Sequence, residues 1–298
     1  MDLKQLRHLV AIIDHESFSR AADAVAISQP ALTRSIKLLE QRLGVALLER
    51  TTRSVSPTPA GERLYKRAKL ILNETDAAIS EVREDLGRSK PLRIGIAPMF
   101  ATTIVPSAIR AFRTIAPDIE VAVQSGLFEV LTAQVAQGDL DLVVSNLPYG
   151  RLEDDLTSET LLDVDVVYLA STDHPLAGHQ KNTLSDLFGY PWAVVDETHA
   201  NDLYGYIFAS EGDAPSPIRV RTNSLNLLKS LIETPPWISL LPRHMVQSEL
   251  DCGQICELHV TGEPVRRNAG IVYRRSRSED PDLKRFSETV RAACADYH

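Results

Sequence analysis

Residues 17–43, SFSRAADAVAISQPALTRSIKLLEQRL, have the pattern of two short helices around a tight turn. In the second helix Ser28 is a suitable N-cap, and Pro30 falls in the first turn, where its missing N–H costs little. Gly44 then provides a C-terminal stop. The pattern constrains the fold because a helix presented in this way fits the major groove of DNA and can read base edges.

The second helix is expected to have one apolar and one polar side. Four leucine or isoleucine residues recur at spacings of 4, 3 and 4 and predict one buried stripe. They are Leu32, Ile36, Leu39 and Leu43. The other side carries amide, hydroxyl, guanidinium and ammonium groups, which bond to bases and phosphates. An ordinary helical hairpin with a solvated polar face would look the same in this stretch alone.

The flanking segments favour DNA binding over the plain hairpin. An apolar pattern from Leu3 to Ile13 predicts a helix that completes a three-helix core. Downstream, GVALLERTTRSVSPTPAG places two arginines on a short Ser/Thr/Pro-rich segment, which suits a β-wing on the phosphate backbone. The expected DNA-binding residues are Ser28, Gln29, Pro30, Thr33, Arg34, Lys37, Arg50 and Arg53.

The run FSRAADAVAISQPALTRSIKLLEQRLGVALLERTTRSVSPTPAGERL resembles the LysR-type transcriptional regulators, and the resemblance continues over all 298 residues. It implies an α/β fold overall with three parts. These are a winged helix-turn-helix domain over residues 1–58, a linker and dimerisation helix over 59–88, and a two-lobed, periplasmic-binding-protein-like effector domain over 89–298. The implied partners are promoter DNA, further copies of the chain and a small organic effector, with RNA polymerase added if the chain activates transcription.

Charge is distributed unevenly along the chain. The net charge is −8, yet residues 1–90 hold 15 Lys and Arg against 12 Asp and Glu, and the remainder holds 17 against 28. DNA affinity is therefore expected from locally placed cations rather than from bulk charge. The sequence has no N-terminal apolar segment and no long apolar run, so a cytoplasmic protein without membrane contact is expected.

A long helix is predicted after the wing, with Thr58 as N-cap and Pro59 at its first position. Six positions in it follow heptad spacing and predict a seam that pairs two chains. They are Leu64, Ala68, Ile71, Thr75, Ala78 and Val82. A single amphipathic helix packed on its own domain is the alternative. Residues 87–91 are expected to form the hinge that follows.

From Leu92 onward, strand-like runs alternate with helical segments. LRIGIA, IEVAVQ and LDLVVS, separated by helices over about 102–115 and 127–137, predict a parallel βαβαβ unit. A second set contains the strands VDVVYLA, WAVVD, IRVRT and WISLLP, and AGIVYRR returns before a C-terminal helix. With the resemblance, lobe I is expected over about 92–163 and 268–298, and lobe II over about 164–267.

Ligands of such folds bind at strand C-termini and helix N-termini, where unpaired N–H groups favour an anion. We therefore expect a small carboxylate-bearing effector with its anionic end at Thr102, Thr103 and Ser125. Met99 and Leu127 are apolar where many members of the family have Ser or Thr, which indicates a partly apolar effector. Plain packing between the lobes is the alternative for the apolar residues. The expected effector-binding residues are Met99, Phe100, Thr102, Thr103, Ser125, Gly126, Leu127, Asn146, His199, Thr222 and Asn223.

No motif supports an enzyme. The sequence contains no Walker loop, GxSxG elbow or metalloprotease helix, and no cofactor or metal is expected. Cys252, Cys256 and His259 follow a C-x3-C-x2-H spacing that a metal or redox site could use, although inert thiols are favoured. The sequence therefore predicts an effector-responsive, DNA-binding homotetrameric regulator. A regulator without an effector is the alternative, and an enzyme in the C-terminal lobes is a weaker one.

Overall fold

A computed structural model describes residues 1–50, 55–84, 90–102, 104–148, 151–152, 155–196, 203–205, 207–208, 216–262 and 264–295. The chain divides into two compact units. The first contains Met1–Leu92, Asp118–Glu120 and Ala133–Asp141, and the second contains Arg93–Pro117, Val121–Thr132 and Leu142–His298.

Three helices form the core of the first unit: α1 (Leu3–His15), α2 (Phe18–Ala24) and α3 (Gln29–Leu43). Helix α1 starts with a capping box, in which the Gln5 backbone N–H donates to Asp2 Oδ1 at 2.8 Å. The three helices bury apolar residues against one another, which confirms the predicted three-helix core. Its fully buried members are Leu9, Ile12, Ala21, Leu32, Ile36 and Leu39.

The ends of α3 differ from expectation in two details. Ser28 has the extended N-cap backbone, but its hydroxyl makes no capping hydrogen bond. Leu43 was expected in the buried stripe and is instead 41% exposed, because it lies in the last turn, beyond the reach of α1 and α2. Pro30 lies in the first turn and Gly44 ends the helix at φ 69°, as the sequence predicts.

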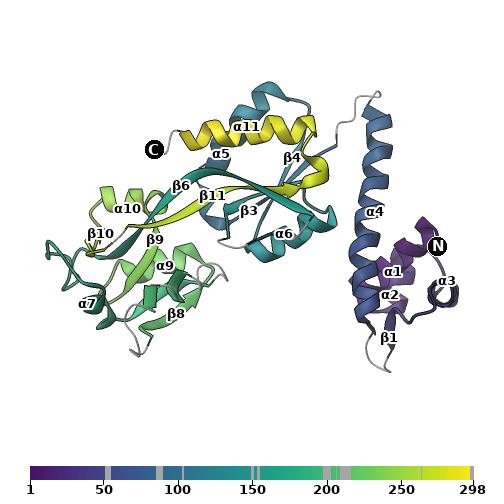
Figure 1. Cartoon of the computed structure of the whole chain (residues 1–298), viewed down its shortest axis with the longest axis horizontal. Helices are drawn as coiled ribbons and strands as arrows, with labels where there is room; N and C mark the ends of the chain where they lie inside the picture. Colours follow the sequence, from purple (N-terminus) through teal and green to yellow (C-terminus); the bar gives the residue numbers. More distant parts are fainter. Residues whose placement is uncertain are drawn as a thin grey trace. The chain divides into compact units, whose positions relative to one another are not determined.

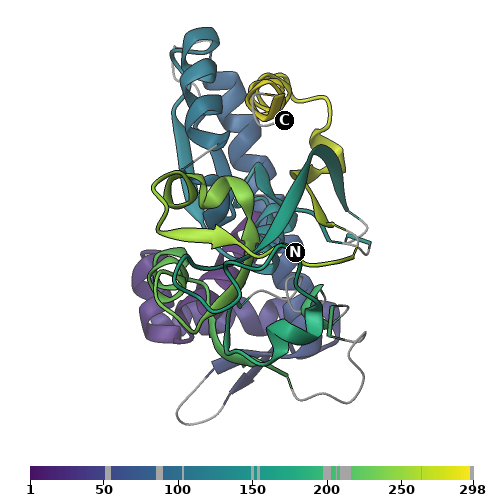
Figure 2. The ribbon, with the colours of Figure 1, turned by 90° about the vertical axis from the view of Figure 1, so that its left-hand side faces the viewer.

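The predicted wing is a two-stranded antiparallel ribbon of β1 (Leu48–Arg50) and β2 (Val55–Pro57), which projects from the helices of its unit (Figure 2). Helix α4 (Pro59–Glu84) follows at once. Thr58 starts it: the Gly61 backbone N–H donates to Thr58 Oγ1 at 3.0 Å, and this hydroxyl donates to the Ala46 carbonyl at 2.8 Å.

Only the second half of the predicted heptad seam is open to a partner. Ala68 is fully buried and packs with Leu6 of α1, and Leu64 packs against the same cluster. These two residues are therefore part of their own unit's core. Further along α4, Ile71 and Val82 are 39% and 76% exposed. Residues 87–89 of the expected hinge over 87–91 lie outside the described residues.

The second unit is built on one mixed sheet with the strand order β4-β3-β5-β11-β6-β9-β7-β8, and β10 pairs with β6. The strands are β3 (Leu92–Ile96), β4 (Val121–Ser125), β5 (Leu142–Asn146), β6 (Leu156–Ser171), β7 (Trp192–Val195), β8 (Ile218–Thr222), β9 (Ile238–Pro242), β10 (Ile255–Glu257) and β11 (Val265–Arg274). The described helices after β3 are η1 (Pro98–Phe100), α5 (Ile104–Ile115), α6 (Phe128–Gln137), α7 (Leu184–Phe188), α9 (Leu225–Ile232), η2 (Arg243–Met245), α10 (Gln247–Asp251), η3 (Arg275–Arg277) and α11 (Pro281–Ala295), of which α6 continues into the first unit from Ala133.

The alternation of strands and helices follows the sequence prediction. Strand β3 pairs with β5 in parallel, and β7 pairs in parallel with both β8 and β9. Between these parallel sets, the long strands β6 and β11 run antiparallel side by side (Figure 1). Helices α5 and α11 pack together, with the Phe112 and Phe286 rings 5.4 Å apart.

Strand β6 is longer than the predicted strand over 164–170. It starts at Leu156, because the polar stretch before Asp163 pairs with the second half of β11. Both β6 and β11 run through the predicted lobe boundaries near residues 163 and 268, so the division into lobes stays a prediction. Strand β10 contains Cys256.

Candidate DNA interface and ligand cavity

The polar side of α3 is open to solvent. Gln29, Arg34 and Lys37 are exposed and Thr33 is half-buried, while the apolar side packs on α1 and α2. The helix therefore presents the expected base-reading groups together on one face. Of the wing residues, Arg53 and the side chain of Arg50 lie outside the described part of the chain.

Two contacts that the sequence did not reveal hold α3 in place. His8 is buried in α1, and its Nδ1 lies 2.7 Å from Ser35 Oγ on α3. Burial, followed by the charge of Lys4, lowers the pKa of His8, so the imidazole is kept neutral. At the other end, Glu40 Oε1 accepts from the backbone N–H groups of Leu47 and Leu48 at 2.9 and 3.3 Å, which ties α3 to the start of the wing.

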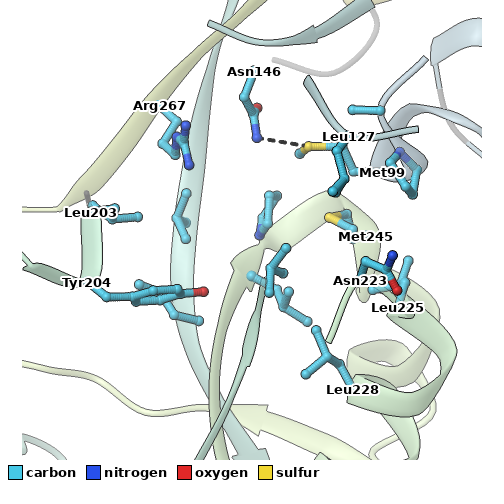
Figure 3. A pocket seen from close by; sticks show the side chains of 17 residues that line it. Met99, Leu127, Asn146, Leu203, Tyr204, Asn223, Leu225, Leu228, Met245 and Arg267 are labelled. Carbon is cyan, nitrogen blue, oxygen red and sulfur yellow. Dashed lines mark hydrogen bonds between the residues drawn. The ribbon is translucent and has the colours of Figure 1, made fainter. Parts of the chain in front are cut away.

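The second unit contains a cavity with about 710 Å³ of empty volume, its open mouth included (Figure 3). Four expected effector-binding residues line it: Met99, Leu127, Asn146 and Asn223. The sequence analysis missed other lining residues, among them Val166, Tyr204, Leu225, Leu228, Met245 and Arg267. Most of the wall is aliphatic, which suits a ligand with an apolar body.

Two of the three residues of the expected anion site, Thr102 and Ser125, do not line this cavity. Thr102 and Ser125 are exposed, since Thr102 precedes the described start of α5 and Ser125 ends β4 at the sheet edge. Thr222 Oγ1 instead accepts the Ser224 backbone N–H at 3.0 Å. Gly126 is half-buried away from the lining, and Phe100 is buried outside it, with its ring 6.4 Å from that of His244. Thr103 and His199 lie outside the described residues.

Arg267 and Asn146 are the main polar groups at one end of the cavity. Strand pairing places Ala269 opposite Asn146, so Arg267, two residues away on β11, lies on the same face of the sheet as Asn146. Figure 3 shows both side chains at the same end of the cavity. Asn146 Nδ2 donates to Met99 Sδ at 3.0 Å. Arg267 is only 5% exposed, and no described residue of the lining is acidic.

The sequence held only a partial signal for Arg267, the alternation expected along a strand. In the first part of β11 Arg267 and Ala269 are buried while Arg266 and Asn268 are exposed, so that Arg267 lies inward and Arg266 outward. Arg266 is accordingly exposed and pairs with Asp165 at 3.1 Å. Strand pairing with β5, which brings Arg267 near Asn146, could not be derived from this alternation.

None of the three cysteines lines the cavity. Burial and the charge of Glu257 raise the pKa of the half-buried Cys256, and burial raises that of Cys294 to about 11. Cys252 is exposed. Among the described residues, no group of His, Cys, Asp or Glu side chains is placed to hold a metal ion. In the same part of the chain, no helix is long and apolar enough to cross a bilayer.

Comparisons with known proteins identify the family. Residues 3–62 match the model of the bacterial regulatory helix-turn-helix protein, lysR family, and residues 86–295 match the LysR substrate binding domain. The chain is 30% identical over 294 residues to the hydrogen peroxide-inducible genes activator of Escherichia coli O6:H1, with 98% of this chain and 95% of that protein covered. It is 32% identical over 286 residues to the SDS degradation transcriptional activation protein of Pseudomonas sp. (strain ATCC 19151), with coverage of 94% and 92%.

A solved structure of a cysteine variant of OxyR from Corynebacterium glutamicum is 29% identical, with a TM-score of 0.61 and coverage of 99% of this chain and 93% of that one. These relatives are regulators, which confirms the interpretation of the chain as a regulator over the enzyme alternative. The chain belongs to the LysR family of bacterial helix-turn-helix transcriptional regulators.

Proposed function

We propose that this regulator alters its DNA complex when a small organic anion with an apolar body occupies the cavity of the second unit. The observation that carries the proposal is the buried guanidinium of Arg267 in a largely aliphatic wall. A guanidinium binds a carboxylate with two parallel hydrogen bonds, and a water-poor surrounding strengthens the attraction. The sequence predicted that the anionic end of the effector binds at Thr102 and Ser125, which are exposed, and we now propose that it binds at Arg267. The proposed position of the apolar end, at Met99 and Leu127, is unchanged.

Replacing Arg267 tests this site. Arg267→Met removes the charge and keeps much of the length, so affinity for short-chain and aromatic carboxylates should fall at least tenfold in calorimetry on the full chain. Arg266→Met is the matched control, because Arg266 is exposed on the other side of the same strand, and its affinity should stay near wild type. Equal losses in both variants, or no carboxylate binding by the wild type, would contradict the proposed site.

A second candidate signal is hydrogen peroxide, which the name of the Escherichia coli relative suggests. Relatives of similar identity carry the names of different signals, so similarity alone does not choose between them. A peroxide response through thiols would use Cys252 and Cys256, each losing a proton and an electron as peroxide is reduced to water. The raised pKa of Cys256 opposes this, because the thiolate is the reactive form. A peroxide-induced change of DNA footprint that Cys252→Ser abolishes would favour this candidate over the carboxylate.

We infer that α3 enters the major groove, with Gln29 and Arg34 at base edges and Thr33 and Lys37 on phosphates. The exposed polar face of α3 and the match of residues 3–62 to the helix-turn-helix model support this placement. Pairing of two chains is proposed through the exposed apolar residues of α4, with separate pairing of the second units to complete a tetramer. Residues 1–90 hold 15 Lys and Arg against 12 Asp and Glu, and this small excess makes local contacts decisive for affinity.

A further inference from the structure

We infer that the effector is a 2-hydroxy carboxylic acid with an apolar side chain, rather than a simple carboxylic acid or an amino acid. This inference rests on the proposed carboxylate site at Arg267 and specifies the group next to the carboxylate. The residue that indicates it is Asn146, at the same end of the cavity (Figure 3).

The amide of Asn146 is only weakly used by the protein itself. Its side chain is 7% exposed, and Nδ2 donates to the thioether sulfur of Met99, which is a weak acceptor. Oδ1 is buried and has no hydrogen-bond partner. Buried polar atoms are nearly always paired in native proteins, and an unpaired one lowers stability. A cavity wall that keeps such an oxygen indicates a ligand that brings a hydrogen-bond donor.

The position of Asn146 relative to Arg267 sets where that donor must be. The two residues are diagonal neighbours on adjacent strands, and such side chains start roughly 7–8 Å apart or less. A carboxylate on the guanidinium therefore brings the substituent of its second carbon toward the Asn146 amide. Rotation about the Asn146 Cβ–Cγ bond, a soft torsion, turns Oδ1 to the ligand at the cost of only the weak bond to Met99.

The charge of the cavity decides between a hydroxyl and an amino group as the donor. A 2-amino acid would bring an ammonium group, which needs a buried carboxylate partner. The described residues of the lining include no acidic side chain, and Arg267 already supplies a positive charge. A neutral hydroxyl can donate to Asn146 Oδ1 without that penalty. The aliphatic wall at Leu127, Leu225, Leu228 and Met245 then contacts the side chain of the acid.

The test compares matched pairs of acids that differ by one hydroxyl. The pairs are hexanoate with 2-hydroxyhexanoate, 4-methylpentanoate with 2-hydroxy-4-methylpentanoate, and 3-phenylpropanoate with 3-phenyllactate, the hydroxy acids as single enantiomers. Calorimetry on the full chain should show one enantiomer of at least one hydroxy acid binding about tenfold tighter than its parent, as expected for one new hydrogen bond to a buried group. The corresponding 2-amino acids should bind more weakly than either.

One variant inside the cavity and one outside it locate the effect. Asn146→Leu should bring the hydroxy acid down to the affinity of its parent, while the parent acid still binds, which also shows that the variant is folded. Arg266→Met, outside the lining on the same strand as Arg267, should keep the tenfold preference. If Asn146→Leu does not fold, Asn146→Val, which also has no acceptor, takes its place, and the wild-type comparison remains decisive.

The outcomes separate this inference from the proposed function. Wild-type chain that binds parent and hydroxy acids equally, or a preference that survives in the Asn146 variants, overturns the hydroxy-acid inference and leaves the carboxylate site standing. Binding of parent acids that Arg267→Met does not weaken overturns the proposed site itself. No binding by any acid of the three pairs overturns both.

Discussion

At the scale of single residues, Gly61 has no side chain, and this allows the first turn of α4 to pack directly on the backbone of Leu47, just before the wing. A Cβ atom there would lie 2.0 Å from the Leu47 carbonyl oxygen, far inside contact distance, and the obstacle is backbone rather than a flexible side chain. Gly61→Ala should therefore lower the free energy of unfolding of the first unit by about 1–3 kcal/mol or more, as overpacking does. Gly178→Ala is the control, because a Cβ there meets nothing within 4 Å. Thermal unfolding should show a lower melting temperature for Gly61→Ala alone; equal melting temperatures would mean that the contact relaxes freely.

Residue-scale features were predicted unevenly. The stop at Gly44 and the start at Thr58–Pro59 were predictable, since caps depend on local chemistry. The contact of His8 with Ser35 joins residues 27 positions apart, and no local pattern encodes it. Arg267 belongs to the same class, because its cavity exists only once β11 pairs with β5.

At the scale of elements, helix α3 allows a direct test of DNA reading. Residues near the N-terminus of a recognition helix contact base edges, and Arg34 is exposed there. Arg34→Ala should cost about 1–3 kcal/mol of binding free energy and relax specificity at one base position, measured by competition between related DNA sequences. Arg42→Ala is the control, because Arg42 lies about 12 Å further along the helix axis. Unchanged sequence preference in Arg34→Ala would show that another surface reads the DNA.

Helix α4 shows that an element can be predicted from the sequence while the partner of its apolar positions cannot. Its start and its heptad spacing were correct, yet Leu64 and Ala68 pack inside their own unit. The sequence alone does not show whether the apolar positions of α4 pack on a second chain or on α1 of the same chain, because both kinds of packing require the same apolar spacing. The exposed remainder of the seam, at Ile71, Ala78 and Val82, is the part left for a partner.

That remainder predicts the effect of a charge on assembly. Ile71→Glu should dissociate the paired chains, since a carboxylate in an apolar seam costs free energy unless it is paired. Light scattering at micromolar concentration should show a smaller particle, and operator affinity should fall with it. Lys66→Glu is the matched control: Lys66 is exposed, and five residues turn the helix by about 140°, so it lies on a different side. A monomeric wild type at the same concentration would exclude pairing through α4.

At the scale of the whole molecule, the two units carry separate tasks, and regulation requires that they be thermodynamically coupled. The helix-turn-helix lies in the first unit, and the cavity with Arg267 lies in the second. An effector can change DNA binding only if it has different affinities for the DNA-bound and free arrangements. Tight binding alone would change nothing.

Reciprocity makes this coupling measurable without knowledge of the target genes. DNA selected from a random-sequence pool provides the site, and the tightest carboxylate from the matched pairs provides the effector. If the effector changes DNA affinity by a given factor, typically about 5- to 150-fold, the DNA must change effector affinity by the same factor. Arg267→Met should bind the DNA as tightly as the wild type, and the effector should leave its DNA affinity nearly unchanged. In Arg266→Met the effector should change DNA affinity by the same factor as in the wild type. Both measurements, the effect of the effector on DNA affinity and the effect of DNA on effector affinity, are made at equilibrium. If neither affinity changes in the wild type, binding in the cavity does not regulate DNA binding by this protein.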